Sequence, residues 1–456
     1  MSGSMHSQDA KTAALARSLV EYALWRTRLD PIPLDHPRSA EDLERHCGET
    51  ITPEGMGGER ALQLWSEVLA PSCLSVDYTR YLAFVPAAPT EASVLFDMVV
   101  SAFSIYGGSW IEGAGAIHAE NEALRWLCDL CGFDAEAGGV FVAGGTAGNL
   151  SAMVGARGAA ERRLAERGVD RPGRWAFVTS PAAHASVASG AAVMDAEVLV
   201  AATGPDGRLT GPAVAAVLDA HPDRVAGVVA TAGTTNLGII DDLDSVGRVC
   251  EERDVFFHVD AAYGGGALAC PSSRPSFDGI ERADSVIVDP HKWLFAPFDC
   301  CALLWRHPEQ ARRVHAQHAD YLDFLGTHGD WNPSDYAMHL TRRARGLPFW
   351  FSLATYGTEA YANAIQATLD LAVEAARQIE ESDHLRLVWG PSLSIVVFER
   401  IGWTAENYEY CTGEMLAKGL AFVVPSRHED KPVFRFCFVN PRTTPDDVAA
   451  IISAMG

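Results

Sequence analysis

The strongest constraint on the fold is a series of short apolar segments in the middle of the chain. Seven of them, separated by helical or turn-rich stretches, occupy residues 140–143, 176–179, 197–200, 226–230, 255–259, 285–288 and 302–305. Continuous apolar strands that alternate with helices predict a mainly parallel sheet covered by helices on both faces. In such sheets a ligand binds outside the carboxyl ends of the strands. We therefore expect an α/β protein whose functional residues follow the strand ends.

The composition is that of a globular protein and excludes several partners. The chain has 456 residues, of which 48% are hydrophobic and 21% charged, enough for more than one domain. Asp and Glu (59) outnumber Lys and Arg (36), giving a net charge of −23. This surplus argues against nucleic acid or an anionic membrane surface as a partner. Because the sequence shows neither a membrane-span pattern nor a signal-peptide pattern, we expect a cytoplasmic protein.

The ten cysteines are too sparse for a disulfide scaffold, and we expect reduced thiols. Cys128 and Cys131 form a CxxC pair, a spacing that also occurs in zinc sites. Because no second pair follows at zinc-site distance and the segment has helical spacing, we interpret both as buried helix residues. The sequence predicts no metal site.

The chain before the sheet region predicts an N-terminal arm. Helical patterns at 11–29 and 59–69 flank a stretch at 30–60 that is rich in Pro, Gly and charge and that we expect to be extended. A segment of this kind does not bury a core of its own. We therefore expect residues 1–85 to pack on a second copy of the chain, in a homodimer.

The chain changes character twice after the last apolar segment. Residues 306–346 have few apolar runs and several His, Asp and Gly, which predicts a long functional loop before a helical stretch at 347–368. The end of the chain predicts a small α+β domain with an antiparallel sheet. Its expected strands are 385–389, 393–398, 421–424 and 433–438, and its expected helices are 369–379, 406–417 and 445–455. The predicted domains are therefore an arm at 1–85, a large domain at 86–365 and a small domain at 366–456.

A glycine-rich turn follows the first strand and opens a helix. Gly144, Gly145 and Thr146 are its first residues. Glycines allow backbone N–H groups to approach an anion, and a helix N-terminus favours negative charge. The turn lacks the pattern of a P-loop and of GxGxxG. It predicts a phosphate site, although such turns also occur for steric reasons alone.

Polar residues also follow three other strands. His184 could stack on a flat ring, although a plain loop histidine would leave the same signature. Asp260 ends a buried strand and needs a cationic partner, which could be a protonated pyridine nitrogen or an Arg or Lys side chain. The small Ala262 leaves room for a ring face, and Thr234 and Thr235 supply hydroxyls at the end of the preceding strand.

A lysine follows the strand at 285–288, in Asp289-Pro290-His291-Lys292-Trp293. Taken alone, a surface lysine in a turn would fit this position. A Schiff-base lysine fits it too, because burial lowers the pKa of the amine and frees it for carbonyl chemistry. The turn, the imidazole, the carboxylate and the lysine match the phosphate, ring, pyridine nitrogen and aldehyde of pyridoxal 5'-phosphate. Together they predict a site for this cofactor.

The chain resembles the pyridoxal-phosphate-dependent group II amino-acid decarboxylases, of the aromatic-L-amino-acid decarboxylase type. The resemblance runs from about residue 81 to the end and is tightest in HVDAAYGG, DPHKWLFAPFDC and LTRRARGL. It implies the aspartate-aminotransferase fold (fold type I), with a mainly parallel seven-stranded sheet, in a homodimer with its sites at the subunit interface. It implies decarboxylation of an L-amino acid to the amine and CO₂.

The same resemblance implies roles for individual residues. Lys292 matches the Schiff-base lysine and Asp260 the partner of the pyridine nitrogen. His184 and Ala262 match the residues on the two faces of the ring. Tyr336 matches the loop tyrosine that returns a proton to Cα after CO₂ leaves. The other cofactor contacts that it implies are Gly145, Thr146, Asp289 and His291.

The substrate pocket is implied by resemblance as well. Its lining is apolar and aromatic, without an evident Arg for a side-chain carboxylate, which favours an aromatic or large apolar amino acid. Any one of these residues could instead be a core residue. The chain departs from its relatives here, because Ala87 replaces a Thr of animal members and Gly108 stands where a Phe often borders the pocket. The implied lining is Phe84, Val85, Pro86, Tyr106, Trp110 and Phe298.

Two other functions remain compatible with the sequence. A pyridoxal-phosphate enzyme of this fold could form an aldehyde or transfer the amino group instead, although aldehyde-forming relatives tend to have Phe at the position of Tyr336. A non-catalytic ligand-binding protein is disfavoured, because Lys292, Asp260, His184 and Tyr336 are all present.

Overall fold

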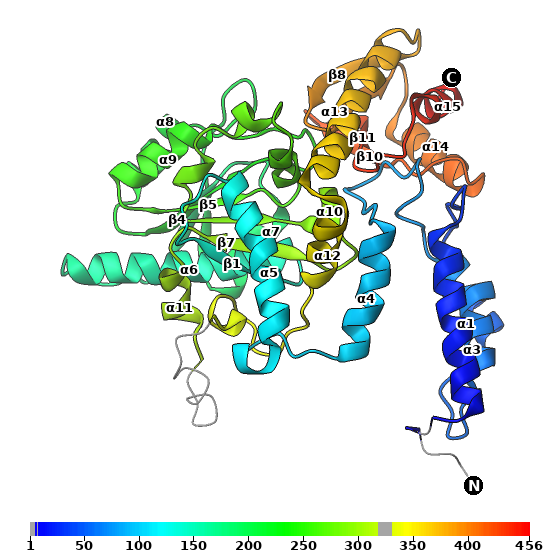
Figure 1. Ribbon diagram of the computed structural model, residues 1–456. Coiled ribbons are helices and arrows are strands. Elements are labelled where there is room, and N and C mark those ends of the chain that lie inside the picture. Colours follow the sequence, from blue (N-terminus) through cyan, green and yellow to red (C-terminus); the bar gives the residue numbers. More distant parts are fainter. Residues whose placement is uncertain (1–4, 7, 318–330) are drawn as a thin grey trace.

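The computed structural model describes residues 5–6, 8–317 and 331–456, and a seven-stranded sheet lies at its centre (Figure 1). The strand order is β1-β7-β6-β5-β4-β2-β3, and β7 alone runs antiparallel to its neighbours. This arrangement confirms the predicted mainly parallel seven-stranded sheet. The strands are β1 (Gly138–Val142), β2 (Ala176–Thr179), β3 (Glu197–Val200), β4 (Val225–Thr231), β5 (Phe256–Asp260), β6 (Ser285–Val288) and β7 (Cys301–Trp305).

The inner strands are buried on both faces, which explains why they are apolar throughout rather than alternating. Every residue of β2, β4, β5, β6 and β7 is buried. Two apolar clusters result, one containing Phe141 and Phe257, the other containing Phe177 and Trp305. The helices around the sheet are α5 (Trp110–Leu130), α6 (Gly145–Glu166), α7 (Ala185–Val193), α8 (Gly211–Ala220), α9 (Leu243–Glu252), α10 (Pro290–Trp293) and α11 (Pro308–His315).

The C-terminal part forms a second, antiparallel sheet with the order β10-β11-β9-β8. The predicted strand at 421–424 is wrong, because the backbone there bonds to the N-terminal segment instead of the sheet. The N–H groups of Leu82 and Ala83 donate to the Phe422 carbonyl, and Phe422 N–H donates to Arg80. The elements are β8 (Leu385–Ser392), β9 (Ile395–Arg400), β10 (Pro425–His428), β11 (Lys431–Cys437), α14 (Ala405–Ala417) and α15 (Pro445–Ala454).

The helical stretch predicted at 347–368 is interrupted. Helix α12 (Leu347–Tyr356) ends before Gly357, and α13 (Thr358–Glu380) begins after it. Gly357 has a φ of 78°, a left-handed conformation that glycine adopts at low cost. The predicted helix at 369–379 is therefore the second half of α13, which packs on β8 and β9 of the second sheet and on the short helix at Gly264–Ala269.

The N-terminal arm contains more helix than its composition suggests. Between α1 (Ala10–Thr27) and α3 (Gly58–Leu64), the stretch expected to be extended includes α2 (Ala40–Cys47), which Ser39 caps. Figure 1 shows α1 and α3 together at the edge of the molecule. Helix α1 has no buried residue, although Leu19, Val20 and Trp25 are apolar. No helix among the described residues has the length and apolarity needed to cross a bilayer.

The segment predicted as a long functional loop, 306–346, lies partly outside the described residues, which omit 318–330. Its described parts include α11 and a short helix at Pro333–Asp335. Beyond them, Arg342 forms a buried ion pair with Glu120 of α5, with N–O distances of 2.7 and 2.8 Å. Glu120 also accepts from Gly346 N–H at 2.8 Å. These contacts fix the end of the segment against α5.

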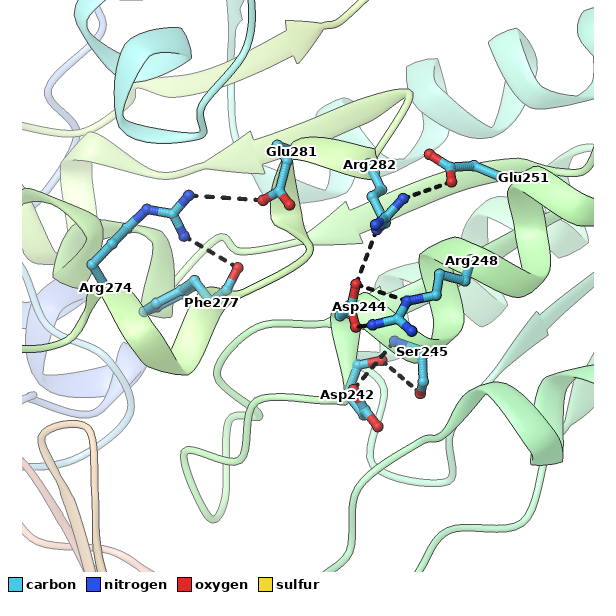
Figure 2. A network of polar contacts seen from close by, with 9 residues as sticks. All are labelled: Asp242, Asp244, Ser245, Arg248, Glu251, Arg274, Phe277, Glu281 and Arg282. Carbon is cyan, nitrogen blue, oxygen red and sulfur yellow. Dashed lines mark hydrogen bonds and ion pairs between the residues drawn. The ribbon is translucent and has the colours of Figure 1, made fainter.

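An exposed ion network, which we call the Arg282 network, links α9 to the turn before β6 (Figure 2). Arg282 donates to Asp244 at 3.0 Å and to Glu251 at 2.7 Å, and Arg248 pairs with the same Asp244. The Arg282 and Glu251 side chains are 30% and 43% exposed. Figure 2 also shows a separate pair, Arg274 with Glu281.

Candidate active site

Residues that follow five strands meet around a cavity of about 610 Å³. They come from the ends of β1, β2, β4, β5 and β6, all of which run in the same direction. The predicted site residues on its wall are Gly145, Thr146, His184, Asp260, Ala262, Asp289, His291, Lys292 and Phe298. The structure therefore brings together most of the residues that the sequence scattered over more than 150 positions.

The floor of the cavity requires glycine. Gly145 is the first residue of α6, and a β-carbon there would lie 3.2 Å from Asp289 Oδ2 and 3.5 Å from the Ala262 β-carbon. A side chain at Gly145 would therefore fill the space in front of the helix N-terminus. With glycine, backbone N–H groups and the exposed Thr146 face that space, which suits a phosphate group. The residues present fit the phosphate end of pyridoxal phosphate.

Lys292 lies on α10 and reaches the cavity beside a buried carboxylate. Its Nζ is 2.8 Å from Asp289 Oδ2, and the Asp289 side chain is 1% exposed. Burial lowers the pKa of Lys292, but the attraction of Asp289 is larger in sum and leaves the pKa above its ordinary value. The expectation of a lysine with a pKa lowered by burial was wrong for this state of the molecule, because the sequence did not show that Asp289 would face the amine.

The carboxyl group of Asp289 has two basic neighbours, the Lys292 ammonium and the His291 imidazole, whose pKa is lowered by burial. Burial raises the pKa of Asp289, but Lys292 and His291 together bring it below its usual value. His291 Nε2 is 3.7 Å from the same oxygen. The other carboxylate oxygen, Oδ1, has no hydrogen-bond partner among the described residues. Asp289 is therefore ionised and holds Lys292 at the cavity wall.

His184 and Ala262 belong to different elements that border the cavity. His184 caps the N-terminus of α7, and Ala262 follows β5. Asp260 accepts a hydrogen bond from Ala262 N–H at 3.1 Å and one from Asn149 Nδ2 at 2.8 Å. No Arg or Lys within ion-pair distance of Asp260 is present in the described part of the chain, which leaves its remaining acceptor capacity for a cationic ligand.

Three polar residues of this site were missed at the sequence level: Asn149, Ser186 and His258. All three are buried. His258 interrupts the apolar run VFFHV, and Asn149 is a polar residue on the buried face of α6. A polar side chain at a position that the pattern assigns to the core was the available signal.

Thr234 does not occupy the predicted place. It is 2% exposed, and its hydroxyl accepts from Ile239 N–H at 3.1 Å within a tight turn. Thr235, which was expected beside it, lies on the cavity wall, and so does Thr231 of β4. The turn after β4 directs Thr234 inward, a detail that depends on backbone geometry and not on the spacing of hydroxyls.

Tyr336 also lies away from the cavity wall. It is 7% exposed and belongs to an apolar cluster, where its ring stacks on Trp331 with 3.9 Å between ring centroids. Burial raises the pKa of Tyr336 to about 12. Its neighbour Met338 reaches the cavity. The structure therefore does not bring Tyr336 to the cavity wall that this chain forms.

The predicted substrate residues separate into two groups. Phe298 lines the cavity, with its ring 4.9 Å from that of His291. The others are not on the wall that one chain forms. Tyr106 donates to the Leu340 carbonyl at 3.1 Å, and Trp110 N–H donates to Asn332 at 2.9 Å. Phe84 is 58% exposed, and Pro86 is buried.

An arginine, Arg435, contacts Phe84, one of the residues implied for the substrate pocket. Arg435 is 5% exposed and donates to the Phe84 carbonyl at 2.6 Å. Its Nε and second terminal nitrogen have no hydrogen-bond partner among the described residues. A buried guanidinium with unpaired donors suits a carboxylate.

Among the residues that the structure describes, no cluster of His, Cys, Asp and Glu has the geometry of a metal site. Cys128 lies in α5, Cys131 follows its end, and both are buried. Burial raises the pKa of Cys128 to about 12 and that of Cys131 further, so both stay protonated thiols. The interpretation of the CxxC pair as buried residues of a helix and its end is confirmed.

Comparison with protein families gives one match over most of the chain. The family model described as "Pyridoxal-dependent decarboxylase conserved domain" matches residues 58–401. This range includes every residue of the cavity wall named above. Arg435 and the strands β10 and β11 lie beyond it, whereas β8 and β9 of the second sheet lie within it.

Relatives and solved structures agree with this match. An aromatic-L-amino-acid decarboxylase of Bacillus atrophaeus is 29% identical over 92% of this chain and 89% of its own length. An L-2,4-diaminobutyrate decarboxylase of Rhizobium meliloti is 32% identical over 82% of this chain and 75% of its own length. The crystal structure of Oryza sativa TDC with PLP and tryptamine has a TM-score of 0.91, covers 99% of both chains and is 22% identical, which shows a shared fold.

Proposed function

This chain belongs to the pyridoxal-dependent decarboxylase family, and we propose that it decarboxylates an L-amino acid at the cavity around Lys292. Members of this family are carboxy-lyases that use pyridoxal phosphate. The observation that carries the proposal is the convergence of Lys292, Asp260 and the Gly145 turn on one cavity wall. A carbonyl-reactive amine, a carboxylate and an anion site lie there together. The amine product and CO₂ are the expected products.

The bound cofactor supplies an aldehyde that reacts with amines and a ring that accepts the electrons of the broken Cα–carboxylate bond. The chain contributes binding and charge. Gly145 and Thr146 would hold the phosphate, and Asp260 would pair with the pyridine nitrogen. His184 and Ala262 would lie on the two ring faces. Asp289 and His291 would set the charge beside the reactive amine.

Lys292 would exchange its proton with its surroundings as a substrate amine enters. In this structure its ammonium is bound to Asp289, so it must lose a proton before it acts as a nucleophile. Asp289 and His291 are the titratable groups beside it. We propose that these two residues receive and return this proton.

The source of the proton that replaces the carboxylate is open to a direct test. Residues 306–346 contain two tyrosines, the buried Tyr336 and Tyr321, which lies outside the described residues. Because Tyr336 is packed against Trp331, we expect Tyr336→Phe to keep most of the decarboxylase activity. Tyr321→Phe is the matched variant. A large loss of activity in Tyr336→Phe alone would return this role to Tyr336.

The substrate is proposed to have an aromatic or large apolar side chain. Phe298 and Met338 on the cavity wall support this choice, since both offer apolar contact. Relatives that decarboxylate diaminobutyrate and the position of Arg435 support including charged substrates in the test. Aromatic, aliphatic, acidic and diamino acids should therefore be compared by kcat/KM.

A homodimer is proposed from the exposed apolar faces. Leu19, Val20 and Trp25 on α1 are 45% to 55% exposed, and Phe103 at the end of α4 (Glu91–Phe103) is 73% exposed. Exposed apolar side chains of this kind suit a protein interface. The dimer would also bring further apolar residues to each cavity. Sedimentation of the wild type and of Trp25→Glu would test this, with a monomer expected for the variant.

The decisive test of the function is the reaction itself. Purified protein loaded with pyridoxal phosphate should show the absorbance of a lysine-bound cofactor and release CO₂ and an amine from at least one amino acid of the panel. Aldehyde and ammonia should be measured in parallel. Aldehyde in amounts equal to the amine would favour an aldehyde synthase, and the absence of any cofactor absorbance would refute the proposal.

A further inference from the structure

A single buried side chain, Asn149, connects the two residues proposed to face the cofactor ring. Asn149 lies on α6 and is 1% exposed. Its Nδ2 is 2.8 Å from Asp260 Oδ2 and 2.8 Å from Ser186 Oγ. Its Oδ1 is 2.8 Å from His258 Nε2. Because a carboxylate only accepts hydrogen bonds, the NH₂ group must face Asp260, and the orientation of the amide is fixed.

This orientation determines the protonation of His258. The carbonyl oxygen of Asn149 accepts, so His258 Nε2 must carry a hydrogen. Burial lowers the pKa of His258 to about 4, so the ring is neutral and Nδ1 is an acceptor. Ser285 Oγ lies 2.8 Å from that Nδ1 and donates to it. The Ser285 carbonyl oxygen, 3.2 Å from the same nitrogen, receives no hydrogen in this arrangement. Every hydrogen bond from Ser285 through His258 and Asn149 therefore donates toward Asp260.

A second branch leads from Asn149 to His184. Ser186 Oγ accepts one hydrogen of the Asn149 NH₂ group, which leaves its own hydrogen for His184 Nδ1, 2.8 Å away. The Ser186 backbone N–H also donates to Nδ1, at 3.2 Å. A nitrogen that accepts twice carries no hydrogen. His184 therefore holds its hydrogen on Nε2, the nitrogen that does not face Ser186.

We propose that Asn149 is a positioning residue that couples Asp260 to His184, fixing the carboxylate and the imidazole tautomer from one amide. The proposal rests on the proposed function for its consequence, since the two residues matter together only if a cofactor ring lies between them. We call the six residues of the two branches the Asn149 network. They are Asn149, Ser186, His184, His258, Ser285 and Asp260.

The alternative to positioning is a purely structural role, in which the network only satisfies buried polar groups. The two roles differ in what each branch controls. If Asn149 positions both residues, cutting one branch should change only the residue at its end. If the role is structural, every cut should lower the melting temperature and leave the properties of the cavity residues unchanged.

Three variants test this. Asn149→Asp keeps the shape but places an acceptor opposite Asp260. Ser186→Ala cuts the branch to His184, and His258→Asn shortens the branch to Asp260. The first readout is ¹⁵N NMR of His184 in the cofactor-free protein, assigned with His184→Gln, which reports the tautomer. The second is the absorbance of the bound cofactor against pH.

We expect Ser186→Ala to change the His184 tautomer signal and leave the absorbance–pH curve near that of wild type. We expect His258→Asn to do the reverse, and Asn149→Asp to change both. For Asn149→Asp, kcat should fall on the order of 10- to 100-fold, as for outer residues that orient ligands. The titratable groups that surround Asp260 are His258 and Lys292, with Asp289 and Cys301 beside that lysine. His258 is absent from His258→Asn, and the part of Lys292, Asp289 and Cys301 in the curve is common to all three variants.

Two results would overturn the proposal. One is a wild-type His184 signal and wild-type absorbance curve in folded Asn149→Asp. The other is that the three variants differ from wild type only in melting temperature. If Asn149→Asp does not fold, the two branch variants decide the question alone. Failure of the proposed function would look different, because wild type would then show no cofactor absorbance while the His184 tautomer would still be measurable.

Discussion

The Asn149 network and the Arg282 network are both polar, and both join elements that are separated in the sequence. They differ in the burial and the charge of their side chains. The first consists of one carboxylate surrounded by neutral groups, nearly all buried, with 2.8 Å contacts around its amide. The second consists of charged side chains with exposed fractions between 29% and 61%. The Arg282 network is therefore built from exposed ion pairs, whereas directed hydrogen bonds from neutral groups to one carboxylate lie behind the cavity.

The comparison indicates that a large number of polar contacts in one region does not by itself mark a functional site. In water a charged pair gains little, because solvent screens it and both side chains lose freedom. In the interior each donor and acceptor must be satisfied, so a change in one forces a change in its neighbours. We therefore expect perturbations of the buried network and cavity to propagate and perturbations of the Arg282 network to remain local.

The largest expected effect is the difference in decarboxylase activity between substitution of a cavity lysine and substitution of a surface lysine. Lys292→Ala removes the only reactive amine of the cavity wall described here, and we expect CO₂ release to fall by ~10³-fold or more, together with loss of the lysine-bound absorbance. Lys418→Ala is the matched control, because Lys418 is 68% exposed and pairs with Glu414 on α14. Equal activity of Lys292→Ala and wild type would remove Lys292 from the mechanism.

The second prediction compares two arginine–carboxylate ion pairs that differ in how deeply they are buried. Arg342 and Glu120 form an ion pair in which both side chains are at most 2% exposed. Arg342→Met leaves the Glu120 carboxylate buried and unpaired, and we expect a loss of about 3–5 kcal/mol in the free energy of unfolding, measured with denaturant. In the adjacent Arg343, whose pair with Asp97 is 35% and 27% exposed, the same substitution should cost about 1 kcal/mol or less.

The double variant Glu120→Leu with Arg342→Met sharpens this result. Removing both charges should restore much of the stability, because the penalty lies in the unpaired charge and not in the lost attraction. If Arg342→Met and Arg343→Met cost the same, burial is not what distinguishes the two pairs.

The third prediction concerns acid. Burial lowers the pKa of His258 to about 4, below its ordinary value of 6.5. Below pH 6.5 the unfolded chain takes up a proton that the folded chain refuses, so stability should fall as the pH drops from about 6.5 to about 4 and then level off. The whole loss is on the order of 3 kcal/mol. His258→Asn should flatten the curve of unfolding free energy against pH over this window. An unchanged slope would contradict the assignment.

Much of the fold was predictable because its strands are apolar on both sides. The seven segments predicted from hydropathy match β1 to β7 within two residues at each end. The predictions are wrong where the backbone hydrogen bonds of a segment depend on residues that are distant in the sequence. Residues 421–424 are apolar and extended, but their backbone bonds to residues 80–83, and no local pattern shows that. Helix α2 was hidden by the Pro and Gly on either side of it.

The cavity was predictable where a residue type is required by the chemistry and lies directly after a strand, as for Lys292 and Asp260. It was not predictable where the direction of a side chain determines whether the residue lines the cavity. Thr234 and Thr235 are adjacent and both carry hydroxyls, but only the second lines the cavity. The charge of Lys292 was also not predictable from the sequence, because it depends on the 2.8 Å contact between Lys292 Nζ and Asp289 Oδ2.

The smallest expected effect is in the Arg282 network itself. Arg282→Gln keeps the aliphatic stem, which packs at Gly247 of α9, and removes the charge that joins Asp244 to Glu251. We expect the free energy of unfolding to change by about 0–1 kcal/mol at low salt. The difference from wild type should shrink in about 1 M NaCl, where charges are screened beyond about 3 Å. Decarboxylase activity and cofactor absorbance should stay at wild-type values. A tenfold loss of kcat with unchanged stability would show that the exposed network communicates with the cavity, and the contrast between the two networks would then fail.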